Sequence, residues 1–141
     1  MHSESDLERF VEAQDAVYES VRRELRAGRK ATHWMWFVFP QLRALGRSTI
    51  AQHYGIVSLD EARAYWQHPL LGARLRRCVE LLGRLPGSDP VPVLGAVDAL
   101  KLRSCLTLFE RAAPDEPLFG RLLAKYYAGA RDAQTLALLD A

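Results

Sequence analysis

Several features that would assign this 141-residue sequence to a class of protein are missing. No apolar run approaches the roughly 20 residues that a membrane-spanning helix needs, so no membrane segment is expected. The N-terminus is acidic and polar and lacks the basic and apolar regions of a secretory signal, so we expect a cytoplasmic protein. The formal net charge of +2 is too small to indicate nucleic-acid binding by itself.

Cysteine is scarce, and the residues present form no metal or redox motif. Cys78 and Cys105 lie among leucines, so both are expected to be reduced thiols in the core. The spacing of His33, His53 and His68 does not match a metal-binding pair such as His-x-x-x-His, so no metal is expected. No glycine-rich or Walker-type phosphate loop is present, which argues against P-loop nucleotide hydrolysis, and no cofactor is indicated.

The composition indicates one globular domain that spans residues 1–141. Hydrophobic residues make up 49% of the chain and charged residues 26%, a balance far from that of disordered proteins. A chain of this length can bury about two thirds of its unfolded surface, so it is expected to fold alone. Residues 86–95 are rich in proline and glycine and predict a loop, and too little chain follows them to form a second core.

Helical spacing and capping residues predict an all-α fold of about seven helices, several of them short, with no significant sheet. The first predicted helix starts at a Ser5–Glu8 capping box and ends at Gly28. Residues 98–109 fit both a strand and a helix, and we choose a helix because no second strand is available to pair with them. Later helices are expected to begin at residues typical of helix N-termini: Ser48, Ser58, Pro69, Asp115 with Pro117, and Asp132.

Residues 33–42, HWMWFVFPQL, contain more aromatic rings than a core requires. Pro40 predicts a short helix before it and a turn after it. The simpler interpretation of the rings is core packing, with His33 as a capping or solvent-facing side chain. In the functional interpretation, Trp34 or Trp36 stacks on a planar group, and His33 and Gln41 form hydrogen bonds with it.

The segment DALKLRS, residues 98–104, is a second candidate for a functional site. Asp98, Lys101 and Ser104 follow one another at three-residue spacing, so neighbours in this series lie close together on a helix. A surface ion pair between Asp98 and Lys101 is the simpler interpretation. The alternative is a lysine that neutralises an anionic ligand, assisted by Arg103 or Ser104. His68, which precedes Pro69, would either cap a helix or contact the ligand.

Five phrases, in the same order and spacing, resemble the bacterial DUF1810 family. They are FVEAQ (10–14), GRKATHWMWFVFPQL (28–42), LDEARAYWQHPLLGARL (59–75), DALKLRSCLTLF (98–109) and YYAGARDAQTL (126–136). The resemblance covers nearly the whole chain and implies a compact, mainly helical domain of unknown function. Some members carry the label calpastatin, but calpastatin-type inhibitors are largely disordered, unlike a chain of this composition.

The leading functional hypothesis is a pocket for a small, planar, anionic ligand such as a nucleotide or an ADP-ribose-like compound. The first alternative is a protein-interaction module that uses an exposed aromatic patch, and the second is an enzyme with His33 or His68 as a general base. Nucleic-acid binding through the basic residues 22–30 ranks last. The sequence leaves turnover open, and the candidate site residues are His33, Trp34, Trp36, Gln41, His68, Asp98, Lys101 and Ser104.

Overall fold

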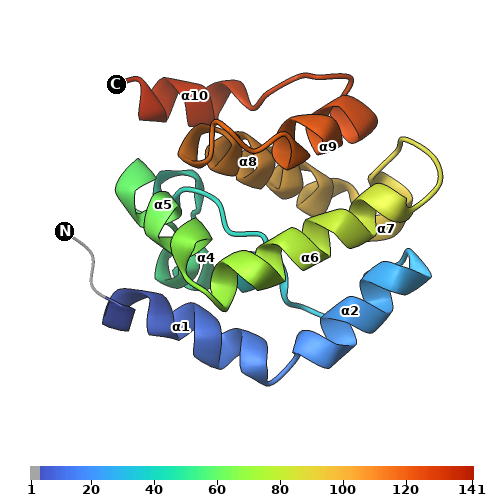
Figure 1. Cartoon of the computed structure of the whole chain (residues 1–141), viewed down its shortest axis with the longest axis horizontal. Helices are drawn as coiled ribbons and strands as arrows, with labels where there is room; N and C mark the ends of the chain where they lie inside the picture. Colours follow the sequence, from blue (N-terminus) through green and yellow to red (C-terminus); the bar gives the residue numbers. More distant parts are fainter. Residues whose placement is uncertain (1–3) are drawn as a thin grey trace.

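The computed structural model describes the backbone of residues 4–141 and the side chains of residues 7–141, and the regular elements of this part of the chain are helices joined by loops (Figure 1). Its only β-type pairing is a single parallel bridge between Leu42 and Ile56. The elements are α1 (Glu4–Asp15), α2 (Tyr18–Ala27), α3 (Met35–Val38), the 3-10 helix η1 (Arg43–Leu45), α4 (Thr49–Tyr54), α5 (Leu59–Gln67), α6 (Leu71–Arg84), α7 (Val91–Leu94), α8 (Ala96–Ala112), α9 (Leu118–Tyr127) and α10 (Ala133–Leu139). The predicted all-α class is confirmed, but the predicted number of about seven helices is wrong, because the described residues form ten α-helices.

The first predicted helix is two helices, because the chain bends between Asp15 and Tyr18. At Val17 the backbone angles are φ −128° and ψ −1°, outside the helical region. Near this bend Gln14 is buried and donates hydrogen bonds to the Phe37 carbonyl at 2.7 Å and to the Tyr65 hydroxyl at 3.0 Å. The bend lets α1 pack against α3 while α2 packs against α6.

The other unexpected helix is α7, which lies inside the predicted proline-rich loop. Pro90 precedes its first residue and Pro92 lies in its first turn, where a helix needs no N–H donor. The Asp89 carboxylate accepts a hydrogen bond from the Val91 N–H at 2.9 Å. Proline therefore favours one turn of helix here, although the same residues would break a longer one.

Several predicted helix ends are confirmed by their hydrogen bonds. Ser48, Ser58 and Asp132 each accept a bond from a backbone N–H three residues further on. Gly28 closes α2 in the left-handed conformation, with φ 75°. The side chain of Ser5 lies outside the described side chains, and its backbone is already helical because α1 begins at Glu4.

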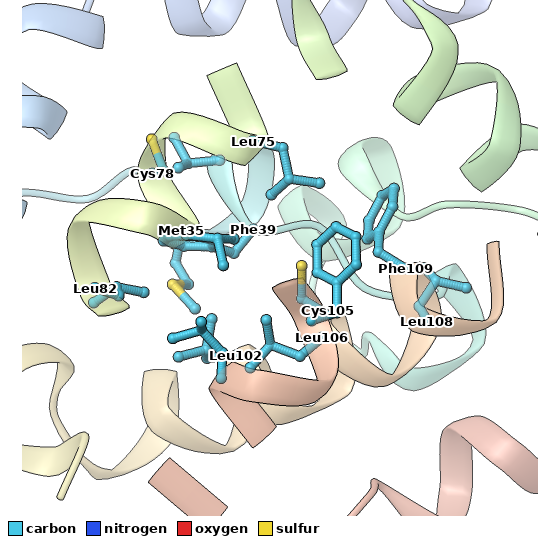
Figure 2. Close-up of a cluster of buried hydrophobic side chains, with 14 of the residues drawn as sticks. Met35, Phe39, Leu75, Cys78, Leu82, Leu102, Cys105, Leu106, Leu108 and Phe109 are labelled. Carbon is cyan, nitrogen blue, oxygen red and sulfur yellow. The ribbon is translucent and has the colours of Figure 1, made fainter. Parts of the chain in front are cut away.

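The central element is α8, which packs against α5, α7, α9 and α10. Every residue from Ser104 to Phe109 is buried, so this helix is enclosed on all sides over its middle turns. Figure 2 shows Leu75, Cys78 and Leu82 from α6 in the same buried cluster as Leu102, Cys105 and Leu106 from α8. Helix formation over 98–109 is confirmed, and the strand-like alternation of leucines reflects burial on several faces.

In Figure 1, α1 and α2 lie along one edge of the molecule and α10 along the opposite edge, with α6 and α8 between them. One contiguous hydrophobic core connects these elements. None of the helices in the described part of the chain combines the length and apolarity needed to span a bilayer.

Candidate functional site

The aromatic run is mostly core. Trp34, Phe37 and Phe39 are buried, whereas Trp36 is half-buried. The short helix α3 explains this division, because side chains two residues apart on a helical turn point in nearly opposite directions, about 200° apart. Of the two tryptophans, only Trp36 is therefore available to a ligand.

A buried carboxylate fixes the loop that leads into this run. Glu24 accepts hydrogen bonds from the backbone N–H groups of Ala31 at 2.7 Å and Thr32 at 3.0 Å, from the Thr32 hydroxyl at 2.7 Å and from the Trp34 indole at 2.9 Å. Burial alone would raise the pKa of Glu24, but these hydrogen bonds outweigh it and lower the pKa to about 2. Trp34 is thus held in the core by its indole N–H as well as by its ring.

A small crevice lies beside the exposed edge of Trp36. Its walls include Trp36, Phe39, Gln41, Tyr54 and Lys101, and its volume of about 10 Å³ has room for about one water molecule. The Lys101 ammonium lies 5.4 Å from the centroid of the Trp36 ring, which is within the range of a cation–π contact. The structure therefore brings Trp36, Gln41 and Lys101 together from two segments that are far apart in the sequence.

A larger open groove of about 470 Å³ shares Gln41 and Lys101 with the crevice. It lies between α8, η1 and the start of α10, and its volume is in the range of small-molecule sites. Its polar lining consists of Gln41, Lys101, Arg103, Ser104, Asp132 and Gln134.

The apolar wall of the groove is aliphatic. Leu45 contributes from η1, and Val97 and Leu100 contribute from α8. Val97 is 67% exposed and Leu100 is 60% exposed, the two largest exposures among the large hydrophobic side chains in the described part of the chain. The groove therefore places an unusually exposed apolar surface next to two cations.

Asp132 offers limited charge to the groove, because its carboxylate already has partners. One oxygen accepts hydrogen bonds from the Thr135 N–H at 2.9 Å and from the Thr135 hydroxyl at 2.6 Å. The other lies 3.8 Å from the Arg103 guanidinium. The buried Ser104 hydroxyl donates a long hydrogen bond of 3.4 Å to the Leu100 carbonyl of its own helix.

Asp98 lies between two lysines on the rim of this site. Its carboxylate is 3.1 Å from the Lys30 ammonium and 4.0 Å from the Lys101 ammonium. The third lysine of the chain, Lys125, donates hydrogen bonds to the carbonyls of Leu85 and Gly87 at 2.6 and 2.9 Å. Lys101 is thus the least constrained lysine of the three.

Of the predicted site residues, the two histidines lie elsewhere, and Trp34 and Asp98 also line neither cavity. His68 caps α6, because its Nδ1 accepts hydrogen bonds from the Leu70 and Leu71 N–H groups at 3.1 and 3.2 Å. His33 is exposed in the loop before α3. Neither histidine lines the crevice or the groove.

Part of the groove could not be predicted from the sequence. Asp132 and Gln134 come from a distant segment, and no local pattern indicated that they would face α8. Val97 and Leu100 did carry a signal, since they place two large apolar residues at three-residue spacing beside Lys101, on the side of α8 away from its buried stripe. Arg103, expected from the sequence only to assist Lys101, lines the groove directly.

Neither thiol offers a reactive group at this site. Cys78 and Cys105 are free and buried, as predicted for core thiols. Burial raises the pKa of Cys78 to about 12 and raises that of Cys105 well above its ordinary value. Among the residues that the structure describes, no three or more His, Cys, Asp or Glu side chains are grouped so that they could hold a metal ion.

Comparison with known proteins gives a family and a fold but no activity. The family model described as "Protein of unknown function (DUF1810)" matches residues 4–139. The chain is similar to the conserved hypothetical protein Rv1873 from Mycobacterium tuberculosis, whose crystal structure is known. The sequence identity is 56%, the TM-score is 0.94, and the match covers 96% of this chain and 97% of that chain. No curated protein matches.

Proposed function

We propose, for a chain that belongs to the DUF1810 family of proteins of unknown function, that it binds a small anionic ligand with a planar group. Nucleotides and ADP-ribose-like compounds have this chemistry. The observation that carries the proposal is the groove of about 470 Å³, which gathers two cations, two side-chain amides and an aliphatic wall. The two free cysteines of the protein, Cys78 and Cys105, are compatible with a reducing compartment, so we also propose a cytoplasmic location.

The charged part of the ligand would contact Lys101 and Arg103. A lysine provides a point charge and an arginine provides a fork of donors, and both are frequent partners of phosphate and carboxylate groups. Gln41 and Gln134 add amide groups that both donate and accept hydrogen bonds. The ligand would therefore be recognised by charge and by polar edges together.

The planar part of the ligand would lie on the apolar surface beside these cations. The edge of Trp36 in the crevice and the side chains of Leu45, Val97 and Leu100 in the groove supply that surface. Trp34 is not part of this proposal, because it is buried and its indole N–H is bonded to Glu24. His33 and His68 are also omitted, because they do not line either cavity.

A thermal-shift screen against nucleotides, NAD fragments, ADP-ribose and phosphorylated metabolites tests the proposal, because binding to the native state raises the melting temperature. We expect at least one dose-dependent hit. In Lys101→Ala the dissociation constant for that hit, measured by titration calorimetry, should rise about tenfold or more through loss of a charge-assisted contact. The melting temperature of the free protein should change by no more than about 2 °C, because the ion pair to Asp98 is long, at 4.0 Å, and partly open to solvent.

Arg111→Ala is the matched control. Arg111 lies on the same helix and pairs with Asp140 at 2.7 Å, but it does not line the groove. Its removal changes the net charge as Lys101→Ala does, so its affinity for the hit should stay within about twofold of the wild type. Unchanged affinity in Lys101→Ala, or an equal loss in Arg111→Ala, would contradict the proposed site.

A second candidate function is the docking of a protein segment that carries apolar and acidic side chains. The large exposure of Val97 and Leu100 favours it, and Lys101 and Arg103 supply complementary charge. The aromatic patch considered from the sequence does not support such docking, because most rings of that run are buried. This candidate predicts a flat small-molecule screen.

We assign no histidine general base at this site. The Nδ1 atom of His68 is engaged as a helix cap, and His33 lies in an exposed loop away from the lining of both cavities. A general base must reach a proton of the bound substrate or of a water molecule beside it. A turnover assay with the compound found in the screen measures whether the bound ligand also reacts.

A further inference from the structure

We infer that Lys30 is a positioning residue for Lys101: it holds the Asp98 carboxylate and so leaves the Lys101 ammonium available to an anion. The inference rests on the proposed function, because it concerns the affinity of the same site. Lys30 itself lines neither the crevice nor the groove, so it acts through Asp98 without touching the ligand.

The distances show which lysine Asp98 prefers. Its Oδ2 atom is 3.1 Å from Lys30, a contact ion pair, whereas its Oδ1 atom is 4.0 Å from Lys101. The side chains of Lys30 and Asp98 are only 10% and 19% exposed, while that of Lys101 is 26% exposed. Charge attraction strengthens at shorter distance and with less solvent, so the Lys30 pair is the stronger one.

Lys30 is also the better anchored of the two lysines. Its backbone N–H donates to the Val93 carbonyl at 2.7 Å, and its ammonium lies 5.2 Å from the centroid of the Trp34 ring. The loop around it is held by the hydrogen bonds to Glu24. Among the described residues, the Lys101 ammonium contacts only the half-buried Trp36 ring, at 5.4 Å, and an Asp98 carboxylate oxygen, at 4.0 Å.

Removal of the Lys30 charge would change the partner of Asp98. Lys101 is the remaining lysine beside the carboxylate, and its flexible side chain can close a gap that is now 4.0 Å. An incoming anion would then have to displace Asp98 from Lys101 before it could bind. Lys30 therefore raises affinity by holding Asp98, a competing anion that belongs to the protein itself, away from Lys101.

Titration calorimetry with ADP and ADP-ribose tests this in four variants. Lys30→Met keeps the length and the apolar contact with Trp34 but removes the charge, and we expect it to weaken binding about fivefold. Lys30→Arg keeps the charge and should bind as the wild type does. Asp98→Asn should bind as tightly as the wild type or a few-fold more tightly, and Lys30→Met combined with Asp98→Asn should return to within about twofold of the wild type.

The recovery in the double variant separates positioning from a structural role. If Lys30 mattered only for the fold of the loop, Lys30→Met would weaken binding equally with or without Asp98, and that result would overturn the inference. Unchanged affinity in Lys30→Met would overturn the inference as well. Weaker binding in the single variant Asp98→Asn would also overturn it. If the wild type binds neither compound nor any other hit of the screen, the proposed function fails, and the role of Lys30 fails with it. If the wild type binds but the double variant does not recover affinity, only the inference about Lys30 fails.

Discussion

At Glu24 one carboxylate organises the turn between α2 and α3. Its partners Ala31, Thr32 and Trp34 follow it by seven to ten residues, beyond the Gly28 that ends α2, so no single helix or strand relates their side chains to that of Glu24. In the sequence, Glu24 is the single acidic residue within a basic cluster at a helix end, which is typical of a solvated surface. The sequence therefore gave no reason to expect a buried acid there.

Glu24 should make stability depend on pH. The pKa of its carboxyl group is about 2 in the folded protein and about 4.5 in an unconstrained chain, so its contribution is complete above about pH 5 and is lost as pH falls towards 2. We expect Glu24→Gln to be less stable than the wild type at pH 7, and this deficit should shrink by about 2 to 3 kcal/mol between pH 6 and pH 2. Urea unfolding curves recorded across that range measure the difference.

Glu19→Gln is the control for this measurement, because Glu19 lies on the same helix, is exposed and pairs only with Arg22 in the described part of the chain. Its stability should follow that of the wild type at every pH. A Glu24→Gln deficit that stays constant from pH 6 to pH 2 would contradict the role given to the carboxylate.

The residue scale also explains why only part of the site could be predicted. Residue types indicated a pocket near Trp36, Gln41 and Lys101, and the structure brings these three side chains together. The pattern could not separate Trp34 from Trp36, because the direction of each ring depends on how the short helix α3 is rotated against the core. Lys101 and Arg103 lie on the long helix α8, whereas His33 and His68 lie in loops, and the sequence does not determine where these loops place a side chain.

At the scale of elements, a glycine sets the close approach of α5 and α6. A Cβ atom added to Gly72 would lie 2.1 Å from the Trp66 carbonyl oxygen, and the backbone would have to move to accommodate it. The first turn of α6 therefore packs directly on the last turn of α5. A side chain larger than a hydrogen atom at position 72 would separate the two helices.

We expect Gly72→Ala to lower the free energy of unfolding by about 3 kcal/mol or more, because the clash is with backbone atoms. Gly83→Ala, in the same helix, is the matched control. Its Cβ atom would meet only a Leu122 methyl group at 3.6 Å, so better helix propensity should leave it neutral or stabilise it by about 0.5 to 1 kcal/mol. Equal urea midpoints for the two variants would show that the helices do not need this close approach.

Elements whose signals are local were predicted well from the sequence. Capping at Ser48, Ser58 and Asp132 depends on residues within one turn, and the structure contains these caps. The bend before Tyr18 depends on the buried amide of Gln14, which pairs with residues much further along the chain. Local pattern recognition therefore counted one helix where long-range hydrogen bonds make two.

For the molecule as a whole, the core is continuous around α8. Cys78 on α6 and Cys105 on α8 both lie in that core, on different sides of Met35 and Phe39 in the view of Figure 2. Neither thiol can react without an opening of the structure, because both are buried and burial raises the pKa of each. The two cysteines are therefore independent reporters of how this core opens.

We expect both thiols to react with a neutral thiol reagent at rates that agree within about twofold at every urea concentration, because one cooperative unfolding step exposes them together. Mass spectrometry of digested samples resolves the two sites. Labelling of Cys78 well before Cys105 would instead indicate that α6 detaches from α8 as a separate unit.

The groove also belongs to the whole molecule, since α8, η1 and α10 meet there only after folding. Composition and helical patterns suffice for the fold class, and they single out Gln41, Lys101 and Ser104, which line this groove. They do not determine which distant segment faces Lys101. Asp132 and Gln134 could have been assigned to the site only from the packing of α10 on α8.

The three lysines have a practical consequence for biochemistry. Lys30 is held in an ion pair and Lys125 donates to two carbonyl groups, whereas Lys101 stands in the groove without a close partner among the described residues. Of these three side chains, an amine-reactive dye or an activated sensor surface will attach most readily to Lys101. Protein immobilised in that way would present its candidate site to the matrix, so a surface-based assay could miss a ligand that the same protein binds in free solution.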